Sequence, residues 1–320
     1  LCELNFSENE FDLVHHLMPA APRYTFPDIV SARPVVIGPL SGSLAIPSAL
    51  GTETTSDQWF SRARDLDRFR FRYDPLLRQS YRKANAVLLA APYMYDVIEP
   101  LISSKPYIYL PWANEGKLQT TKRHSIAQKL VLLHVGRAVR TKGLRETIRA
   151  LAKTKDLPNI SLISAGTGPD LERCKAEARE LGVSEQISFL GHVRRSEIDE
   201  LYRKADVFCF PSYREPIGHV VFEAMAMGLP IITAAHGGPE YITNDDCSIR
   251  IRPDGRDVFQ QGISRAIRKL YFDLDKRTEM SKASLIRAQS FGTWNQKAAE
   301  LAGIYESVLR PSTSHRSSQL

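Results

Sequence analysis

Two glutamates, Glu215 and Glu223, stand eight residues apart around a predicted helix start. Proline suits the first turn of a helix, so the helix is predicted to begin near Pro216. The amides of a first turn have no acceptor within the helix, and with the positive end of the helix dipole they attract anions. A glycine among them would let a ligand approach the backbone closely. The residues that would form this anion site are Gly218, His219 and Val220.

The spacing of these groups matches a nucleotide. Glu223 follows Gly218 by five residues, which is roughly 7–8 Å along a helix, and its side chain leans back toward the helix start. A terminal phosphate and the ribose hydroxyls are separated by a similar distance, and Glu215 would then face a group beyond the phosphates, such as a sugar. The alternative is that both glutamates are solvated side chains that favour the helix dipole. The apolar neighbours of Glu223 predict a largely buried helix, in which a carboxylate needs a partner.

Two cations follow a glycine at a predicted strand end. Gly136 and Arg137 come directly after an apolar run, and Lys142 precedes the next helical pattern. Arginine can bind phosphate oxygens in a bidentate manner, and lysine acts as a point charge. The alternative is an ordinary Lys-Gly helix start. A second turn, with Gly166 and Gly168, lacks the third glycine of a dinucleotide-binding fingerprint and the Gly-Lys-Ser/Thr of a P-loop.

The elements that would position these residues alternate in the second half of the chain between short apolar runs and helical patterns. This alternation favours a parallel sheet covered on both faces. Ligands of such sheets bind outside the carboxyl ends of the strands, where each glycine-rich turn falls. Strands are predicted at 130–135, 160–165, 187–190, 206–210 and 229–234, and one helix at 196–204 with a serine cap. In the first half, strands are predicted at 32–37, 86–90 and 107–110, the first of them entering a glycine turn at 38–42.

The composition indicates a soluble globular protein, with 43% apolar and 25% charged residues. No apolar run approaches the ~18–20 residues of a membrane span, and the N-terminus lacks the features of a signal peptide. The four cysteines are widely spaced and form no metal-type pair, so free thiols in a reducing compartment are expected. We therefore expect a cytoplasmic protein, with no metal site.

The net charge of +7 is concentrated in one stretch. Between Trp59 and Lys83 there are eight basic residues and three acidic ones, interleaved with aromatic residues. Such a mixture suits an anionic membrane surface or nucleic acid. The alternative is a solvated helix pair whose aromatic side chains pack inward. Of the two partners the stretch favours an anionic surface at the inner face of a membrane, and no nucleic acid partner is expected.

The order and spacing of the motifs are more specific than any motif alone. The sequence contains, in this order, Gly136-Arg137, Lys142-Gly143, Gly166-Thr167-Gly168-Pro169, Leu190-Gly191-His192-Val193, Pro211-Ser212-x-x-Glu215-Pro216-x-Gly218, Glu223-Ala224-Met225-Ala226-x-Gly228-x-Pro230 and Gly237-Gly238-x-Glu240. Over residues 130–245 this series closely resembles the donor domain of family 4 glycosyltransferases, the retaining, nucleotide-sugar-dependent enzymes with the GT-B fold. The resemblance implies an α/β chain with two Rossmann-like, doubly wound domains that face a cleft.

The resemblance also implies roles for the donor-side residues. Arg137 and Lys142 would neutralise the donor diphosphate and the departing nucleotide. Glu215 would contact sugar hydroxyls near the anomeric carbon, and Glu223 the ribose hydroxyls. The turn at 192–193 (His192 and Val193) would flank the base. The donor would be a UDP- or GDP-sugar, used without a divalent metal or other cofactor.

The first half resembles the acceptor domain more loosely. The segment 11–16 is similar to one that ends a strand with a histidine at the cleft; His15 is the first choice for that position and His16 the second. The alternative is a histidine that merely ends a strand. In the family, a strand and a glycine-rich loop precede this segment by many tens of residues, whereas here only eleven residues precede Asp12. The N-terminal domain is therefore expected to lack its first strand–helix units.

These features predict four parts of the chain. An N-terminal acceptor-side domain is expected at 1–118, a nucleotide-sugar domain at 119–292, a C-terminal helix at 293–310 and a disordered, serine-rich tail at 311–320.

The expected function is transfer of a sugar from a nucleotide-sugar to a glycan or lipid-linked acceptor, with retention of configuration. The catalytic candidates are Glu215, Arg137, Lys142 and His15. Two alternatives stay open: a nucleotide-sugar-binding module without transferase activity, and a sugar-nucleotide epimerase on the same fold.

Overall fold

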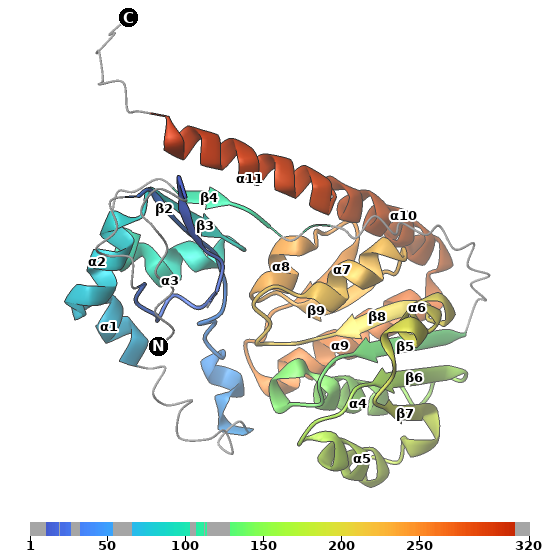
Figure 1. The fold of residues 1–320 in the computed structure, drawn as a ribbon. Helices are drawn as coiled ribbons and strands as arrows, with labels where there is room; N and C mark the ends of the chain where they lie inside the picture. The colour runs from blue at the N-terminus through green and yellow to red at the C-terminus, as the bar shows by residue number, and fades with distance from the viewer. Residues whose placement is uncertain are drawn as a thin grey trace, which may run out of the picture. The chain divides into compact units, whose positions relative to one another are not determined.

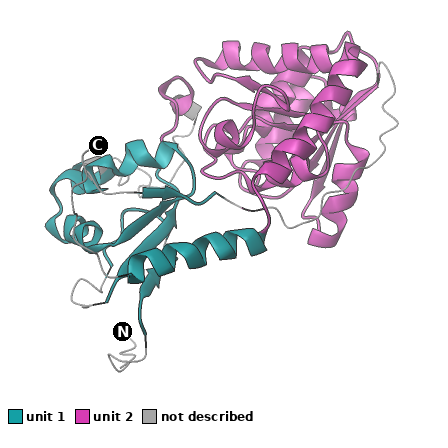
Figure 2. Ribbon diagram, turned by 90° about the horizontal axis from the view of Figure 1, so that it is seen from above, with its two compact units in different colours: residues 1–43, 61–111, 294–320 teal, residues 44–60, 112–293 magenta. Residues whose placement is uncertain are grey.

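The chain folds into two compact units, each built on its own parallel sheet (Figures 1 and 2). The computed structural model describes residues 11–18, 20–26, 33–53, 66–102, 107–111, 113 and 129–310. Unit 1 comprises residues 1–43, 61–111 and 294–320, and unit 2 comprises 44–60 and 112–293. The predicted tail at 311–320 lies outside the described residues, as does most of the predicted domain boundary.

Unit 1 contains four parallel strands in the order β1-β2-β3-β4. Its elements are β1 (Val14–His16), β2 (Val35–Leu40), α1 (Asp67–Tyr73), α2 (Pro75–Lys83), β3 (Ala86–Leu89), α3 (Tyr93–Ile102), β4 (Tyr107–Tyr109) and α11 (Trp294–Leu309). One core cluster joins α2 and α3 to the sheet through Leu77, Tyr81 and Ile98. The other places α11 against the sheet residues Val36 and Leu88.

Unit 2 contains six parallel strands in the order β10-β9-β8-β5-β6-β7. Its strands are β5 (Leu130–Val135), β6 (Ile160–Ala165), β7 (Ile187–Gly191), β8 (Val207–Phe210), β9 (Ile231–Ala234) and β10 (Ser248–Ile251). Its helices are α4 (Leu144–Ala152), α5 (Leu171–Glu180), α6 (Arg195–Lys204), α7 (His219–Ala226), α8 (Gly238–Ile242), α9 (Arg256–Phe272) and α10 (Leu274–Ser290), with 3-10 turns η2 (Ser48–Glu53), η4 (Arg140–Lys142) and η5 (Ser184–Gln186).

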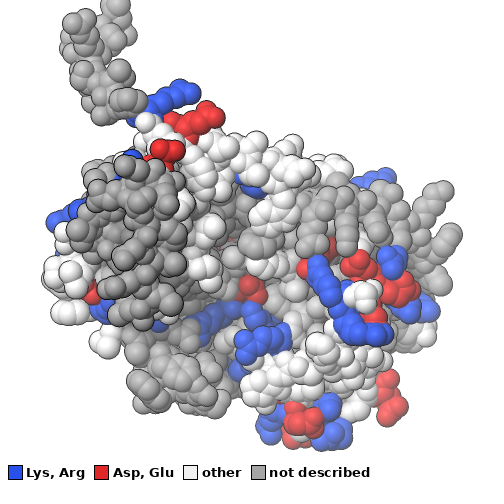
Figure 3. Space-filling view, in the orientation of Figure 1, with Lys and Arg blue, Asp and Glu red and all other residues white. Residues whose placement is uncertain are grey.

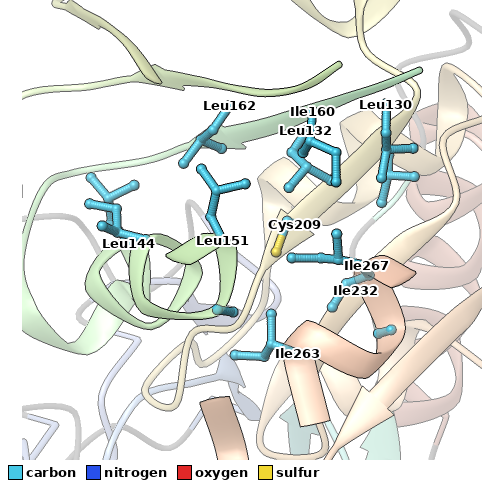
Figure 4. Packing of buried hydrophobic residues seen from close by; sticks show 14 of the residues in the cluster. Leu130, Leu132, Leu144, Leu151, Ile160, Leu162, Cys209, Ile232, Ile263 and Ile267 are labelled. Atoms are coloured by element: carbon cyan, nitrogen blue, oxygen red, sulfur yellow. The ribbon is translucent and has the colours of Figure 1, made fainter. Parts of the chain in front are cut away.

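Helices cover both faces of the unit 2 sheet because successive strand residues point to opposite sides. In β5, Leu132 packs with α4, α5 and α9, whereas Leu133 packs with α6 and α7. In β8, Cys209 faces the first group and Phe208 the second. Figure 4 shows the first cluster, in which side chains from β5, β6, β8 and β9 meet side chains from α4 and α9. The predicted parallel sheet and its strands are confirmed, and so are free, buried thiols at Cys174, Cys209 and Cys247.

The two units differ from the domains expected from the sequence in two segments. Residues 44–60 group with unit 2 instead of the N-terminal domain, because Leu50 of η2 packs in the core cluster of α4, α5 and α9. The C-terminal helix α11 groups with unit 1 because its apolar residues cover the unit 1 sheet.

Two local predictions are wrong. β2 continues through the expected glycine turn to Leu40, where it still pairs with Leu89 of β3. α6 begins at Arg195, so Ser196 lies inside the helix instead of capping it; the Glu197 carboxylate accepts a hydrogen bond from the Arg194 amide at 3.3 Å. The acid three residues into the helix therefore takes over the role expected of the serine.

Candidate functional site

The loops after β5 and β6 touch at their glycines. A Cβ on Gly166, whose φ is +138°, would lie 1.9 Å from the carbonyl oxygen of Gly136, so only glycine allows this approach. The Ala138 amide donates to the Thr167 carbonyl at 2.9 Å and fixes the contact. The predicted glycine turns are therefore brought side by side at the carboxyl ends of adjacent strands.

The loop after β5 is also bound to the loop after β8. The Ser212 hydroxyl and the Tyr213 amide both donate to the Thr141 carbonyl, at 3.0 and 3.1 Å. A Cβ on Gly143 would lie 2.2 Å from the Pro211 carbonyl oxygen, and its φ of +80° is also one that favours glycine. These contacts fix the backbone on either side of Lys142, although Ser212 and Tyr213 lie some seventy residues away in the sequence.

Lys142 and Glu215 form a direct ion pair in this arrangement. The Lys142 Nζ donates to the Glu215 Oε2 at 2.5 Å, and both side chains are largely buried. The other carboxylate oxygen, Oε1, accepts from the Gly218 amide at 3.1 Å. The ammonium also lies over the Phe210 ring, 5.9 Å from its centre. A cation, a carboxylate and the start of a helix therefore converge at one point.

The helix at this point begins three residues later than predicted. α7 starts at His219 instead of near Pro216, because Gly218 adopts a left-handed conformation with φ +91° that a helix cannot contain. The Glu215 side chain closes the turn by accepting from the Gly218 amide. The amides at the start of α7 still point out of the helix, beside the ion pair.

A buried ionic network supports the turn that carries Lys142. The two terminal guanidinium nitrogens of Arg140, Nη1 and Nη2, donate to the carboxylate of Glu146 at 2.7 and 2.6 Å, and Glu146 has no solvent exposure. The Arg140 guanidinium also lies over the Tyr213 ring. On α4, the guanidinium of Arg145 binds Glu177 at 2.5 Å. Buried ion pairs of this kind fix the orientation of both side chains, because a buried charge that leaves its partner loses the interaction that offsets its burial.

Glu223 lies on α7 and its carboxylate is hydrogen-bonded by α6. The Arg195 Nη1 donates to Oε1 at 2.5 Å, and the Tyr202 hydroxyl donates to Oε2 at 2.9 Å. The expected burial of α7 is confirmed for Val221, Phe222, Ala224 and Met225. Glu223 and Val220 are only partly buried, and His219 is exposed. The partner that a carboxylate on this helix was expected to need is thus partly supplied by the protein.

The charges of the site influence His219, which adjoins both glutamates. Partial loss of hydration lowers its pKa; Glu215 and Glu223 act in the opposite direction, and Lys142 lowers the pKa further. The pKa of the His219 imidazole therefore depends on the charges of both carboxylates and of the Lys142 ammonium.

The remaining candidates lie at less constrained positions. Arg137 is exposed, and no ion pair to it is found among the residues that the structure describes. His192 is exposed and Val193 half-buried in the turn between β7 and α6, and the Gly191 carbonyl at the head of this turn accepts from the Gly166 amide at 2.7 Å. Gly168 lies close to the backbone of Ala138: a Cβ on it would be 2.3 Å from the Ala138 carbonyl oxygen.

His15 lies in unit 1, on β1, and both of its ring nitrogens are hydrogen-bonded. Nε2 is 2.7 Å from the Gly38 carbonyl oxygen and Nδ1 is 2.6 Å from the Tyr305 hydroxyl. A carbonyl only accepts, so Nε2 carries the proton and Nδ1 accepts from Tyr305 in the neutral ring. Burial lowers the pKa of His15, which favours that neutral form. The ring of its neighbour His16 packs at a tilt against the Phe26 ring, with ring centres 4.6 Å apart.

Sequence reasoning missed four residues that lie at or near the candidate site in unit 2. Arg195 and Tyr202 carried no motif. His134, on β5, is buried with Nδ1 3.0 Å from the Cys209 carbonyl oxygen, and its Nε2 has no hydrogen-bond partner among the described residues. Leu44 comes from the first half of the chain and meets Gly237, where a Cβ would lie 2.4 Å from the leucine. Only the apolar character of residues 44–50 could have signalled this last contact.

Beyond the site, the charges on unit 2 are mixed. Figure 3 shows acidic and basic side chains interspersed over α5 and α6, in agreement with the ion pairs Lys175–Glu172, Arg194–Glu197 and Arg203–Glu200. Within the described ranges, no three histidine, cysteine or acidic side chains are grouped so that they could hold a metal ion. No helix among the described residues is long and apolar enough to cross a membrane.

Comparison with known proteins supplies independent findings. Residues 118–285 match the family model described as "Glycosyl transferases group 1". An uncharacterized glycosyltransferase of Methanocaldococcus jannaschii is 35% identical over 138 residues, 43% of this chain and 35% of that protein. A D-inositol 3-phosphate glycosyltransferase of Corynebacterium kroppenstedtii is 33% identical over 188 residues, 56% of this chain and 41% of that protein. The chain thus spans less than half the length of these two relatives.

Among solved structures, Anabaena Alr3699/HepE in complex with UDP aligns with a TM-score of 0.66 and 18% identity, covering 88% of this chain and 74% of that one. The shared architecture is the GT-B fold, with two Rossmann-like domains, as the motif series predicted.

Proposed function

Because the chain belongs to the group 1 glycosyl transferases, we propose that it transfers a sugar from a nucleotide-sugar donor to a glycan or lipid-linked acceptor, with retention of configuration. The observation that carries this proposal is the convergence of Lys142, Glu215 and the start of α7. A lysine and helix amides favour a diphosphate, and a carboxylate beside them favours a hydroxyl-rich group attached to it. The complex of Alr3699/HepE with UDP supports a uridine donor, and a GDP-sugar is the second candidate.

The diphosphate would bind at the amides of α7 and Lys142. The ammonium has three N–H donors and uses one for Glu215, so two stay available for phosphate oxygens. Arg137, exposed at the end of β5, would add a second cation. The first amides of α7 and these cations would stabilise the charge that develops as the nucleotide departs.

The sugar would lie beside Glu215, whose carboxylate is fixed by Lys142 and the Gly218 amide. In the transfer step, the bond between the anomeric carbon and the phosphate oxygen breaks, and its electron pair leaves with the diphosphate. The acceptor oxygen forms the new bond on the same face, and its proton passes to the departing phosphate. The chain's role is to hold the reacting atoms and stabilise the leaving charge.

The ribose would bind Glu223 and the base would lie against His192 and Val193. Gly136, Gly166 and Gly168 would let the loops after β5 and β6 come close to the donor. His15 stays a proposed acceptor-side residue, and its neutral ring would act through hydrogen bonds.

A binding and product assay tests the proposal. Calorimetry with UDP and GDP should show binding of one of them, and NMR of the product should show a new α- or β-linkage matching that of the donor. Binding without transfer or donor hydrolysis would support the alternative, a nucleotide-sugar-binding module. Epimerised donor formed without acceptor would support the epimerase, and binding of neither nucleotide would overturn the donor site.

An anionic membrane surface is the proposed partner of the stretch at α1 and α2. Phe69 and Tyr73 stand four residues apart on one side of α1, Leu66 precedes this helix and Leu76 lies in α2; each of the four is about 60% exposed. Phe71 and Tyr81 pack inward instead. The alternative of an inward-packed aromatic set therefore describes only part of the stretch. The same two helices also carry the basic residues Arg70 and Arg72 on α1 and Arg82 and Lys83 on α2.

Vesicle co-sedimentation tests this partner. The chain should sediment with vesicles containing anionic phosphatidylglycerol and not with neutral phosphatidylcholine vesicles. The double substitution Phe69→Ser and Tyr73→Ser should abolish sedimentation, whereas Phe272→Ser, at an equally exposed aromatic on α9, should not. Equal sedimentation of all three proteins would contradict a membrane surface at α1 and α2.

A further inference from the structure

The Glu223 carboxylate is held by two hydrogen-bond donors that both come from α6, Arg195 and Tyr202. They stand seven residues apart, which is two helical turns, so they project from the same side of α6. We infer that Arg195 and Tyr202 are positioning residues that orient Glu223 to accept the two neighbouring hydroxyls of a ribose. The inference rests on the proposed nucleotide-sugar function and adds to it the protein groups that make the site selective for ribonucleotides.

Tyr202 is the fixed part of this arrangement. Its side chain is 1% exposed and packs against Phe208 with ring centres 5.8 Å apart, so its hydroxyl has little freedom. The hydroxyl lies 2.9 Å from Glu223 Oε2 and 3.2 Å from the Val220 carbonyl oxygen, both acceptors on α7. Burial and the neighbouring carboxylate raise the pKa of Tyr202 well above its ordinary value, so it remains a donor at every physiological pH.

Arg195 is the solvent-facing part. Its side chain is 58% exposed, whereas that of Glu223 is 24% exposed. It is the first residue of α6, directly after the turn that contains His192 and Val193. The guanidinium reaches Oε1, the carboxylate oxygen that Tyr202 does not contact. One donor therefore sits on each oxygen, and the plane of the carboxylate is fixed from both sides.

The number of acceptor positions points to a diol. A carboxylate offers about four lone-pair sites, two on each oxygen. Tyr202 and Arg195 occupy one site on each oxygen, which leaves one open site per oxygen. Two neighbouring hydroxyls, such as the 2′- and 3′-hydroxyls of ribose, supply one donor to each. The ligand can bind without displacing either residue, and a nucleotide lacking these hydroxyls gains nothing from the arrangement.

Calorimetry with matched nucleotides tests the inference. Wild-type protein is titrated with UDP and GDP and with their 2′,3′-dideoxy forms. Tyr202→Phe keeps the ring and its packing but removes the hydroxyl, and should weaken binding of the preferred ribonucleotide about 5- to 10-fold. Binding of the dideoxy form should change less than about twofold. A merely structural role would weaken both ligands equally.

A second variant keeps the test decisive if Tyr202→Phe loses its fold in circular dichroism. Arg195→Gln removes the exposed donor and should also reduce affinity for the ribonucleotide only, with a larger effect at low salt. Arg194→Gln is the matched control, because this neighbouring arginine pairs with Glu197 and not with Glu223. Equal losses for both ligands, or no loss in either variant, would overturn the inference while leaving the donor site in place. Absence of binding to wild-type protein would overturn the proposed function itself.

Discussion

At the scale of single residues, Lys142 and Glu215 form one ion pair, so the charge that each can offer to a ligand depends on the other. The ammonium neutralises the carboxylate in the unbound protein, and a diphosphate would draw part of its charge away. Glu215 would then become a stronger acceptor for sugar hydroxyls at the moment the donor binds. In the proposed function, the pair would thus link binding of the phosphates to recognition of the sugar.

Glu215→Gln separates these two roles. The amide oxygen of glutamine can still accept from the Gly218 amide, but the charge that attracts Lys142 is removed. We expect affinity for the nucleoside diphosphate to be kept or increased, and the transfer rate to fall by about 100-fold or more. Calorimetry and initial transfer rates measure the two effects. Glu185→Gln, an exposed acid at η5, is the control, and unchanged turnover in Glu215→Gln would exclude this residue from the site.

His134 makes folding stability depend on pH. Its pKa is lowered to about 4, mainly by complete burial; the hydrogen bond to the Cys209 carbonyl opposes this shift, and the charge of Lys142 adds to it. The unfolded chain takes up a proton near the ordinary pKa of about 6.5, whereas the folded chain does so only near 4. The free energy of unfolding should therefore be constant above about pH 6.5 and fall by up to ~3 kcal/mol as the pH drops to about 4.

Urea unfolding at a series of pH values measures this loss. His134→Phe keeps a ring beside Phe210 and removes the titration, so the slope between pH 4 and 6.5 should become shallower than in wild-type protein. An unchanged slope would show that other groups cause the acid sensitivity.

At the scale of elements, the turn η4 is tied to the helix that follows it, α4. Arg140 holds the turn through Glu146 of α4, which is fully buried. Glu146→Gln removes the buried carboxylate charge that the nearly buried Arg140 guanidinium binds, and should lower the free energy of unfolding by about 3 kcal/mol. Chemical unfolding measures this loss. Glu200→Gln, which breaks an exposed pair with Arg203 on α6, should have little effect, and similar losses in both variants would argue against a special role of the buried pair.

The elements of unit 2 could largely be predicted from the sequence, whereas several side-chain partners could not. The strands follow from nearly continuous apolar runs such as 130–135, because strands of a sheet that is covered on both faces need apolar residues on both sides. α7 begins later than the sequence predicts, because Pro216 favours a helix start near itself but Gly218 adopts a left-handed conformation that the helix cannot include. A proline is compatible with the first turn of a helix but does not determine where the helix begins. Here the residues before α7 form a turn in which the Glu215 carboxylate accepts a hydrogen bond from the Gly218 amide.

Partners that meet only through tertiary packing gave no sequence signal. Tyr202 lies in an ordinary amphipathic helix, and its role depends on how α6 packs beside α7. Residues 44–53 lie far in the sequence from the rest of unit 2, yet Leu50 packs in its core. Contacts at long sequence separation carry no periodicity of their own, so single-sequence patterns cannot locate them.

At the scale of the whole molecule, the two units have separate hydrophobic clusters. Unfolding is therefore expected in two transitions, of which only one responds to nucleotide. The preferred nucleoside diphosphate at 100 times its Kd should raise the free energy of unfolding of unit 2 by about 2.7 kcal/mol. Differential scanning calorimetry measures both transitions. Val87→Ala, in the core of unit 1, should lower the other transition and leave the ligand response unchanged.

A single transition shifted by both the ligand and Val87→Ala would show that the units unfold together.

The position of α11 has a consequence for how the chain is made. This last helix covers Val36 and Leu88 of a sheet whose strands belong to the first third of the chain. During synthesis, unit 1 has to wait with one face of its sheet uncovered until residues 294–309 leave the ribosome. The stretch that forms most of unit 2, residues 129–293, has by then already emerged. Unit 2 should therefore complete its core first, and the early strands of unit 1 are the part of the nascent chain most in need of a chaperone.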